Sequence, residues 1–190
     1  KTSNIILFLD SAGPLFKSDL ELFGYNIKID KKIWYSEIND FFKRLEKKLN
    51  CKIFIIPHPK NKGVKNPMYD KSFKFLHEQD AALNYVPKAK LVLANSPTTA
   101  LAYAVAYDKK IIMFYNDQIL NKDFTRHRET KFISKILKLP FVNISRKFEL
   151  SKCLKPVNKK LYDDYKIKYL TSKSISNKMN FEILKEIANK

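Results

Sequence analysis

The chain has 190 residues, of which 45% are hydrophobic and 13% aromatic, and this composition predicts a folded protein and excludes an intrinsically disordered one. Its 37 Lys and Arg against 19 Asp and Glu give a formal net charge of +18, which favours an acidic partner: nucleic acid, an anionic membrane surface or a phosphorylated substrate. No apolar run approaches the ~20 residues that cross a bilayer, and the two cysteines, Cys51 and Cys153, have no metal-binding spacing.

No secretory signal peptide precedes the first apolar run. We therefore expect a cytoplasmic protein that is at most peripheral at the inner face of the cytoplasmic membrane. The sequence begins Lys-Thr-Ser without a methionine, and the first predicted strand starts only a few residues later. We accordingly expect a fragment from which an N-terminal partner domain is missing.

Strands and helices are predicted to alternate along the chain. Asn4–Leu9 is an apolar run typical of a central parallel strand, and a long ordered loop is predicted from there to Asp30. Apolar residues spaced three and four apart predict an amphipathic helix over Lys32–Leu49. The later predicted elements are, in order, strand Cys51–Pro57, short strand Ser72–Leu76, short helix Glu78–Val86, strand Leu91–Ala94, helix from about Thr98 to Tyr107, strand Ile111–Phe114, helix from about Asp123 to Leu137 and strand Phe141–Ile144.

This alternation, with no polar alternation inside the strands, predicts an α/β fold: a Rossmann-like parallel sheet with helices on both faces. We assign it to residues 1–146. Residues 147–190 are basic and have helical periodicity, so we expect them to form a C-terminal helical extension that packs along the same domain.

The polar turn between the strand at Leu91–Ala94 and the following helix carries the signals of a helix start, with Ser96 at the N-cap and Pro97 at the first helical position. Such a start, placed at the carboxyl end of a parallel strand, points backbone N–H groups at a bound phosphate. Plain capping would explain Ser96 alone, but it does not require three hydroxyls in four residues. We predict that Asn95, Ser96, Thr98 and Thr99 bind an anionic substrate group.

His58-Pro59-Lys60 follows another predicted strand, on the edge where open α/β sheets bind ligands. The imidazole and the ammonium can both donate to a phosphate, and Pro59 stiffens the turn. A histidine that merely ends a strand is the alternative. The neighbouring anion-binding turn favours a shared binding site.

Three more residues are candidates for the same edge. Asp10 and Ser11 follow the first strand, where a base, a nucleotide contact and an ordinary turn are all open alternatives. Glu78 begins a short helix and is a candidate for contact with a ribose. The stretch Arg126–Glu129, in contrast, is predicted to be a solvated helix face.

Several familiar motifs are missing. The sequence has no Gly-x-Gly-x-x-Gly and no Walker loop. It also has no HExxH, no paired CxxC and no Asp-x-Asp that would hold a nucleotide-bound divalent ion. We therefore expect neither a cofactor nor a metal, so that protein groups alone would stabilise a leaving phosphate.

Taken together, the strand followed by His58-Pro59, the strand followed by the Ser96 to Thr99 turn, and the segment KKIIMFY resemble the C-terminal nucleotide-sugar-binding domain of GT-B type glycosyltransferases of bacterial surface-polysaccharide synthesis. Relatives of this type include sialyltransferase-like enzymes and enzymes of capsule and lipopolysaccharide synthesis. The opening ILFLDSAGPLF is similar to the first strand and interdomain loop of that domain. The resemblance implies that His58, Pro59, Ser96, Thr98 and Thr99 bind the donor phosphate and, as in the sialyltransferase-like members, stabilise a departing CMP.

This chain departs from many such enzymes at one point. They carry a carboxylate just inside the Ser/Thr helix, which contacts the ribose, whereas this sequence has Ala100, Leu101 and Ala102 there. Their catalytic base usually lies in the N-terminal domain.

The resemblance implies the donor-binding half of a metal-independent glycosyltransferase that uses a nucleotide-activated sugar, with a CMP-sugar favoured. The expected partners are this donor, a saccharide or lipid-linked saccharide acceptor and, through surface lysines, an anionic membrane. One alternative is a basic nucleic-acid-binding module with Tyr and Phe stacked on bases, but most aromatic residues lie at core-like spacing, so no nucleic acid is expected. A sugar-nucleotide epimerase or a CDP-alditol phosphotransferase on the same fold is the other alternative.

Overall fold

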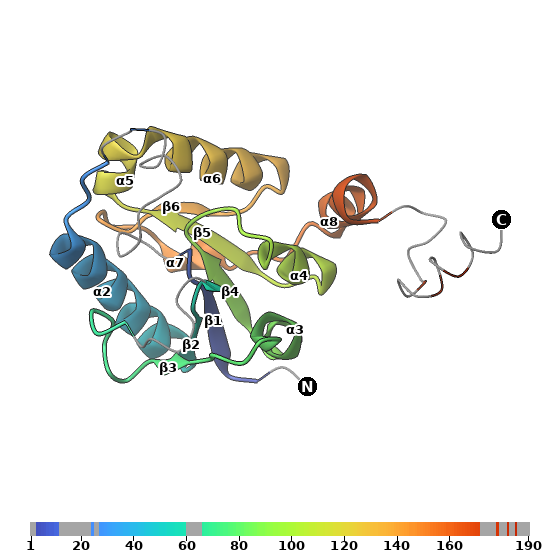
Figure 1. The fold of residues 1–190 in the computed structure, drawn as a ribbon, viewed down its shortest axis with the longest axis horizontal. Helices are drawn as coiled ribbons and strands as arrows, with labels where there is room; N and C mark the ends of the chain where they lie inside the picture. Colours follow the sequence, from blue (N-terminus) through green and yellow to red (C-terminus); the bar gives the residue numbers. More distant parts are fainter. Residues whose placement is uncertain are drawn as a thin grey trace.

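The computed structural model describes residues 3–11, 24, 27–59 and 66–171, together with residues 178, 182 and 185. Within them, all strands belong to one parallel six-stranded sheet with the order β3-β2-β1-β4-β5-β6 (Figure 1). The strands are β1 (Ile5–Leu9), β2 (Lys52–Ile56), β3 (Lys74–Phe75), β4 (Leu91–Ala94), β5 (Ile111–Tyr115) and β6 (Phe141–Asn143). The predicted Rossmann-like α/β fold is confirmed.

Helices cover both faces of this sheet, with α2 on the opposite side from α3 and α4 (Figure 1). The predicted long loop before Asp30 lies almost entirely outside the described residues. The helices are α2 (Lys31–Leu49), α3 (Ala81–Tyr85), the 3-10 turn η3 (Val86–Lys88), α4 (Leu101–Ala106), α5 (Asp117–Lys122), α6 (Phe124–Ile136), α7 (Leu150–Cys153), α8 (Lys159–Tyr165) and the π-helical turn η4 (Lys166–Leu170).

The central strand β1 is apolar throughout because both of its faces are covered. Ile6 and Phe8 pack under α2, whereas Leu7 and Leu9 point to the opposite face and pack with residues of α3 and α4. All four side chains are buried. Continuous apolar strands are therefore the sequence pattern of a sheet with helices on both sides.

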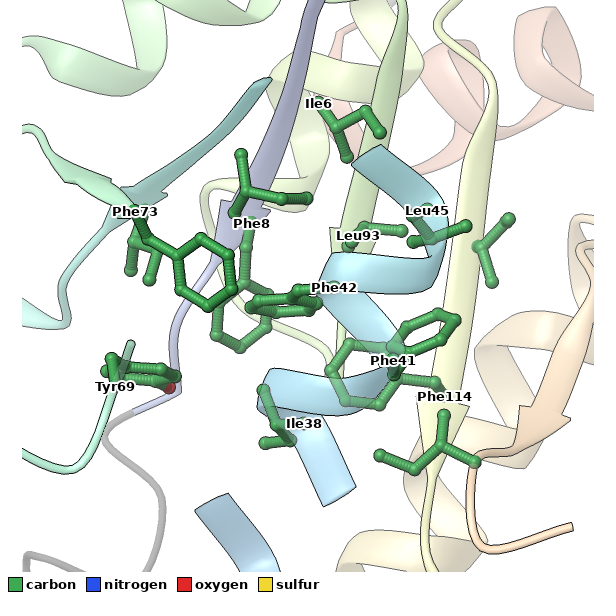
Figure 2. Close-up of a cluster of buried hydrophobic side chains, with 14 of the residues drawn as sticks. Ile6, Phe8, Ile38, Phe41, Phe42, Leu45, Tyr69, Phe73, Leu93 and Phe114 are labelled. Atoms are coloured by element: carbon green, nitrogen blue, oxygen red, sulfur yellow. The ribbon is translucent and has the colours of Figure 1, made fainter. Parts of the chain in front are cut away.

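Helix α2 supplies the largest share of one core face. The Asp30 carboxylate accepts hydrogen bonds from the backbone N–H groups of Lys32 and Ile33 at its start, and Asn50 ends it in the left-handed conformation. The Phe42 ring stacks edge-to-face on Phe8, with centroids 5.0 Å apart (Figure 2). These aromatic contacts fix α2 against the middle of the sheet.

Helix α6 corrects the prediction of a solvated face at Arg126–Glu129. Arg128 and Glu129 are exposed, but the His127 ring is buried edge-to-face against Tyr115, with centroids 4.8 Å apart. The prediction failed because positions 123, 127, 130 and 134, four buried residues, form the inward stripe of the helix.

The first part of the predicted C-terminal extension packs on the same core. The Tyr162 side chain of α8 is buried among residues of β4, β5 and α4. Its hydroxyl donates a hydrogen bond to the carbonyl of Lys109 at 3.0 Å.

We expect Phe42→Ala to lower the free energy of unfolding by about 3–5 kcal/mol, because the ring is fully buried and the space it leaves cannot collapse. Phe132→Ala is the matched control, since that ring is 61% exposed and its loss should change stability by less than about 0.5 kcal/mol. Urea unfolding measures both. Equal effects of the two substitutions would contradict the packing described for α2.

A pH-dependent contribution is expected from His127, because burial, with a smaller effect of Lys131, lowers the pKa of its imidazole. In the unfolded chain its pKa is about 6.5, so below that pH the unfolded state binds a proton that the folded state does not, and stability falls until the folded pKa is passed. His127→Phe should keep the ring packing and remove this loss. Urea unfolding between pH 7.5 and pH 5 should therefore show a shallower dependence for the variant, and an unchanged dependence would refute the assignment.

Candidate functional site

The pairing register of three neighbouring strands brings their carboxyl ends to one place. Leu9, the last residue of β1, lies opposite Ile56 of β2 and Ala94 of β4. Strands β2 and β3 lie on one side of β1, and strands β4, β5 and β6 lie on the other. The direction in which successive strands extend the sheet therefore reverses between β1 and β4. Such a switch point leaves a crevice beyond the strand ends, where open α/β sheets bind their ligands.

A cavity of about 570 Å³ lies at this edge, a volume within the range typical of small-molecule sites. Its floor is apolar and comes from the ends of β1 and β2, from the residue after β3 and from α3. Most of the residues predicted from the sequence line it: Asp10, Ser11, His58, Pro59, Glu78, Ser96, Thr98 and Thr99. The fold thus brings together four segments that are far apart in the chain.

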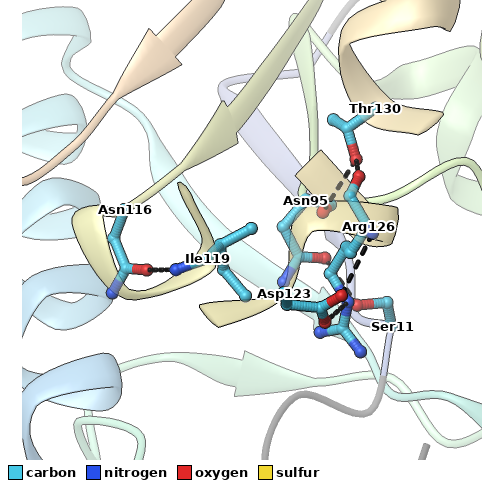
Figure 3. Close-up of polar contacts among 7 residues, drawn as sticks. All are labelled: Ser11, Asn95, Asn116, Ile119, Asp123, Arg126 and Thr130. Atoms are coloured by element: carbon cyan, nitrogen blue, oxygen red, sulfur yellow. Dashed lines mark hydrogen bonds and ion pairs between the residues drawn. The ribbon is translucent and has the colours of Figure 1, made fainter. Parts of the chain in front are cut away.

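Two predicted residues are placed differently. Asn95 does not line the cavity but is buried beside it, where its Oδ1 accepts a hydrogen bond from the Ser11 hydroxyl at 2.8 Å (Figure 3). The carbonyl of Asn95 accepts from the Thr130 hydroxyl at 3.4 Å. Lys60 lies outside the described residues.

The predicted helix start after β4 is wrong in its position. Helix α4 begins at Leu101, and Ala100 rather than Ser96 occupies the N-cap position. The amide of Leu101 donates to the carbonyl of Thr98 at 3.0 Å, so Thr98 and Thr99 form a turn ahead of the helix. Neighbouring β-branched residues with hydroxyls favour such a turn over a helix interior.

Because α4 begins only at Leu101, the Ser96 to Thr99 turn would bind an anion through individual donors and not through a helix start. A helix of six residues contributes little as a dipole, so the individual donors matter more. Within the described chain, the backbone N–H groups of Thr98 and Thr99 form no hydrogen bond, and the buried Thr98 hydroxyl has no partner. Thr98 and Thr99 both line the cavity, and consecutive amides in a turn can bind an anion.

The cavity lining supplies both hydrogen-bond donors and acceptors. His58 and the Ser96 to Thr99 turn offer hydrogen-bond donors, whereas Asp10 and Glu78 carry carboxylates. The described lining residues include no Lys or Arg. Donors suit a phosphate, carboxylates suit hydroxyl groups, and the apolar floor suits a flat ring, so the arrangement matches the three parts of a nucleotide.

A larger cavity, of about 630 Å³, lies beside the edge strand β6. No predicted site residue lines it. Its walls are strongly basic and carry Lys110, Lys138, Arg146, Lys147, Lys152 and Lys155. The excess of positive charge is therefore found here and on the surface rather than in the cavity at the switch point.

Three residues that the sequence did not predict as site residues are Tyr35, Tyr69 and Arg126. Burial raises the pKa of the Tyr35 and Tyr69 phenols, and the Asp10 carboxylate raises both further. Arg126, in the first turn of α6, lowers the pKa of Tyr35 by its charge, and its Nε pairs with the buried Asp123 at 3.2 Å. The inward stripe of α6 could have identified the buried Asp123, but nothing in the sequence placed α2 or α6 beside the end of β1.

Metal-binding clusters and membrane-spanning helices are absent from the described residues. No three His, Cys, Asp or Glu side chains of this part of the chain come together in a way that could hold a metal ion. None of its helices combines the length and the apolar composition that crossing a bilayer requires.

No protein-family model and no curated protein matches the sequence. Among solved structures, the chain is similar to Thermosulfurimonas dismutans KpsC, described as a beta Kdo 2,4 transferase, with a TM-score of 0.39 and 16% sequence identity over 59% of this chain. The match covers 34% of KpsC.

The unpartnered Thr98 hydroxyl gives a stability test of the site. Thr98→Val should leave the free energy of unfolding unchanged or raise it slightly, because it replaces a buried hydroxyl that has no hydrogen bond to lose. Thr130→Val is the control, since that buried hydroxyl donates to the carbonyl of Arg126 at 2.7 Å, and its loss should cost about 1 kcal/mol. Urea unfolding measures the free energy of unfolding of both variants. A loss of stability for Thr98→Val as large as that for Thr130→Val would show that the Thr98 hydroxyl has a structural partner.

Proposed function

We propose that this chain is the donor-binding half of a glycosyltransferase that uses a nucleotide-activated sugar, with a CMP-sugar favoured. The observation that carries the proposal is the convergence of His58-Pro59 and the Ser96 to Thr99 turn on one cavity at the switch point of a 3-2-1-4-5-6 sheet. These are the two motifs on which the resemblance to GT-B type enzymes rests. The two sequence motifs therefore line the same cavity, which has the size of a small-molecule site.

In this proposal, each part of the cavity has one role. The apolar floor takes the base, and the Glu78 and Asp10 carboxylates accept hydrogen bonds from hydroxyl groups of the nucleoside. His58, the hydroxyls of Ser96, Thr98 and Thr99 and their neighbouring amides bind the phosphate. Glu78 would supply the carboxylate that is missing at Ala100 to Ala102, since it lines the same cavity.

The reaction would be a direct displacement of the nucleotide by a saccharide or lipid-linked saccharide acceptor. As the bond from the sugar to the phosphate breaks, negative charge develops on the phosphate oxygens, and donors that are already in place stabilise it without reorganisation. His58 is the proposed catalytic residue because an imidazole N–H can donate to the leaving phosphate. Protein groups would then do this work without a metal ion.

We further propose a cytoplasmic location with peripheral contact to an anionic membrane, where a lipid-linked acceptor would be found. The support is the net charge of +18 and the absence of Lys and Arg from the described lining of the site, which leaves the cations available for a surface.

Nucleotide binding tests the proposal. We expect CMP or UMP at about 100 times its Kd to raise the Tm of the full chain by about 5–10 °C. His58→Ala should weaken binding about 10- to 150-fold, the effect of losing one hydrogen bond to a charged group, and His58→Gln, which keeps an N–H donor, should recover part of it. Thr125→Val, on α6 and outside the cavity, should bind like the wild type.

Isothermal titration calorimetry with CMP, UMP and a single-stranded oligonucleotide separates the alternatives. Absence of binding by any mononucleotide would refute the proposed site. Oligonucleotide affinity that falls steeply with salt, without mononucleotide binding, would favour the nucleic-acid module. An epimerase or a phosphotransferase would bind the nucleotide but transfer no sugar to a saccharide acceptor.

A further inference from the structure

The cavity beside the edge strand β6 combines positive charge with an apolar wall. Its described lining carries six cations against one carboxylate, that of Glu149. Apolar side chains, including those of Leu139, Phe141, Phe148 and Val157, make up much of the remaining lining. We call it the basic cavity, after its cations Lys110, Lys138, Arg146, Lys147, Lys152 and Lys155.

Three of these cations have no counter-charge in the protein. Within the described residues, the ammonium groups of Lys138, Lys147 and Lys155 form no ion pair or hydrogen bond, and all three residues are exposed. The other three cations bind a carbonyl or a carboxylate at 3.0, 3.1 and 2.9 Å. Like charges around one cavity repel each other, and a bound anion removes this repulsion. The basic cavity therefore fits an anionic ligand.

Helix α6 leads directly into this cavity. Leu137 and Lys138 follow its last residue, Ile136, and both line the basic cavity. The helix lies along one margin of the fold (Figure 1). Its exposed residues, apart from Glu129, are aromatic or cationic and fall within about a third of the helix circumference. We call these five residues the outer face of α6: Phe124, Arg128, Lys131, Phe132 and Lys135.

The outer face of α6 exposes apolar rings where a surface helix usually carries polar residues. Phe124 and Phe132 are 66% and 61% exposed, the highest values among the large hydrophobic side chains of the described residues. The same helix buries His127, Thr130 and Ser134. This distribution departs from the ordinary one, in which apolar residues face the core and polar residues face solvent. Large exposed rings among cations indicate an interaction surface.

The two features together select the kind of partner. Lysine ammonium groups pair with phosphate groups, whereas Phe rings and aliphatic walls offer no hydrogen bond and favour an acyl chain or a lipid interface. A soluble polyanion such as nucleic acid would use the cations but would leave the aliphatic wall of the cavity uncovered. An anionic phospholipid supplies the phosphate and the apolar chain in one molecule.

We propose that the basic cavity and the outer face of α6 form a membrane-docking surface, in which the cavity binds the phosphate of an anionic phospholipid and the Phe124 and Phe132 rings enter the lipid interface. This inference rests on the membrane contact in the proposed function and assigns it to named residues. The described linings of the basic cavity and of the cavity at the switch point share no residue. Membrane and nucleotide can therefore be bound at the same time.

Neutralising the unpaired lysines tests the role of the cavity. One variant of the full chain combines Lys138→Gln, Lys147→Gln and Lys155→Gln. It should bind vesicles of phosphatidylcholine with phosphatidylglycerol about 100-fold more weakly than the wild type, because each lysine near an anionic surface contributes about 1 kcal/mol. Cosedimentation measures this binding, which should weaken as salt is raised and be absent with phosphatidylcholine alone.

The matched control removes the same charge elsewhere. Lys47→Gln, Lys48→Gln and Lys71→Gln replace three exposed lysines that lie outside the basic cavity and α6. Because charges away from the contact are screened, this variant should bind the vesicles within about 3-fold of the wild type.

Phe132 tests the apolar part of the surface. Phe132→Ala should weaken vesicle binding about 10-fold, since burial of the ring in the interface is lost, whereas Ile33→Ala, at an exposed apolar residue of α2, should bind as the wild type does. In Phe132→Trp, indole emission should shift to the blue with anionic vesicles and stay unchanged with phosphatidylcholine alone.

Three results would overturn the inference: no binding of the wild type to anionic vesicles, equal losses in the cavity variant and its lysine control, or tighter binding to a single-stranded oligonucleotide than to the vesicles. Calorimetry with CMP keeps the two proposals apart, because the lysine and Phe132 variants should bind CMP as the wild type does. Loss of vesicle binding with CMP binding intact concerns the membrane-docking surface, and absence of CMP binding in the wild type concerns the proposed donor site.

Discussion

The parallel pairing of β1 with both β2 and β4 is the constraint on which the rest of the structure depends. Its register aligns Leu9 with Ile56 and with Ala94. Because all three strands run in the same direction, the chain leaves the sheet at one edge three times, and the residues that follow must gather there. The cavity and its polar lining both follow from this alignment.

The helices on the two faces of the sheet place different side chains near this edge. On one face, α2 is held by aromatic packing on Phe8 and Phe114, which brings its first turn, with Tyr35, to the end of β1. On the other face, α6 is held by its buried stripe and by Asp123, which brings Arg126 to the same edge. Rigid packing far from the edge therefore positions polar groups at the edge.

These polar groups reduce stability, which makes their clustering informative. A buried donor or acceptor without a partner costs about 1–3 kcal/mol, a sizeable share of the stability of a domain of this length. The described polar atoms of this kind belong to Trp34, Tyr35, Asn66, Tyr69, Asn95, Thr98 and Arg126, and Thr98 lines the cavity. Functional sites commonly depart in this way from the rules that stabilise the rest of a fold.

The charge of the protein is distributed unevenly in a way that composition alone conceals. The net charge of +18 favours an acidic partner, yet carboxylates, imidazoles, hydroxyls and backbone amides line the cavity at the switch point. The lysines gather elsewhere, including around the cavity beside β6. Recognition of a phosphate here would depend on directed hydrogen bonds more than on net charge.

The sequence by itself determined the strands, most helices, the fold class and most of the polar residues that line the cavity, because burial on both faces leaves continuous apolar runs and ligand-binding residues follow strand ends. The sequence did not determine the start of α4. The pattern predicted a helix cap at Ser96, whereas Thr98 and Thr99 form a turn and the helix begins at Leu101. It also gave no indication that the Asp10 carboxylate would raise the pKa of the Tyr35 and Tyr69 phenols or that the charge of Arg126 would act on Tyr35. Only tertiary packing decided that, because contacts between residues of α2, α6 and β1 depend on how whole helices dock on the sheet, and no local pattern records that docking.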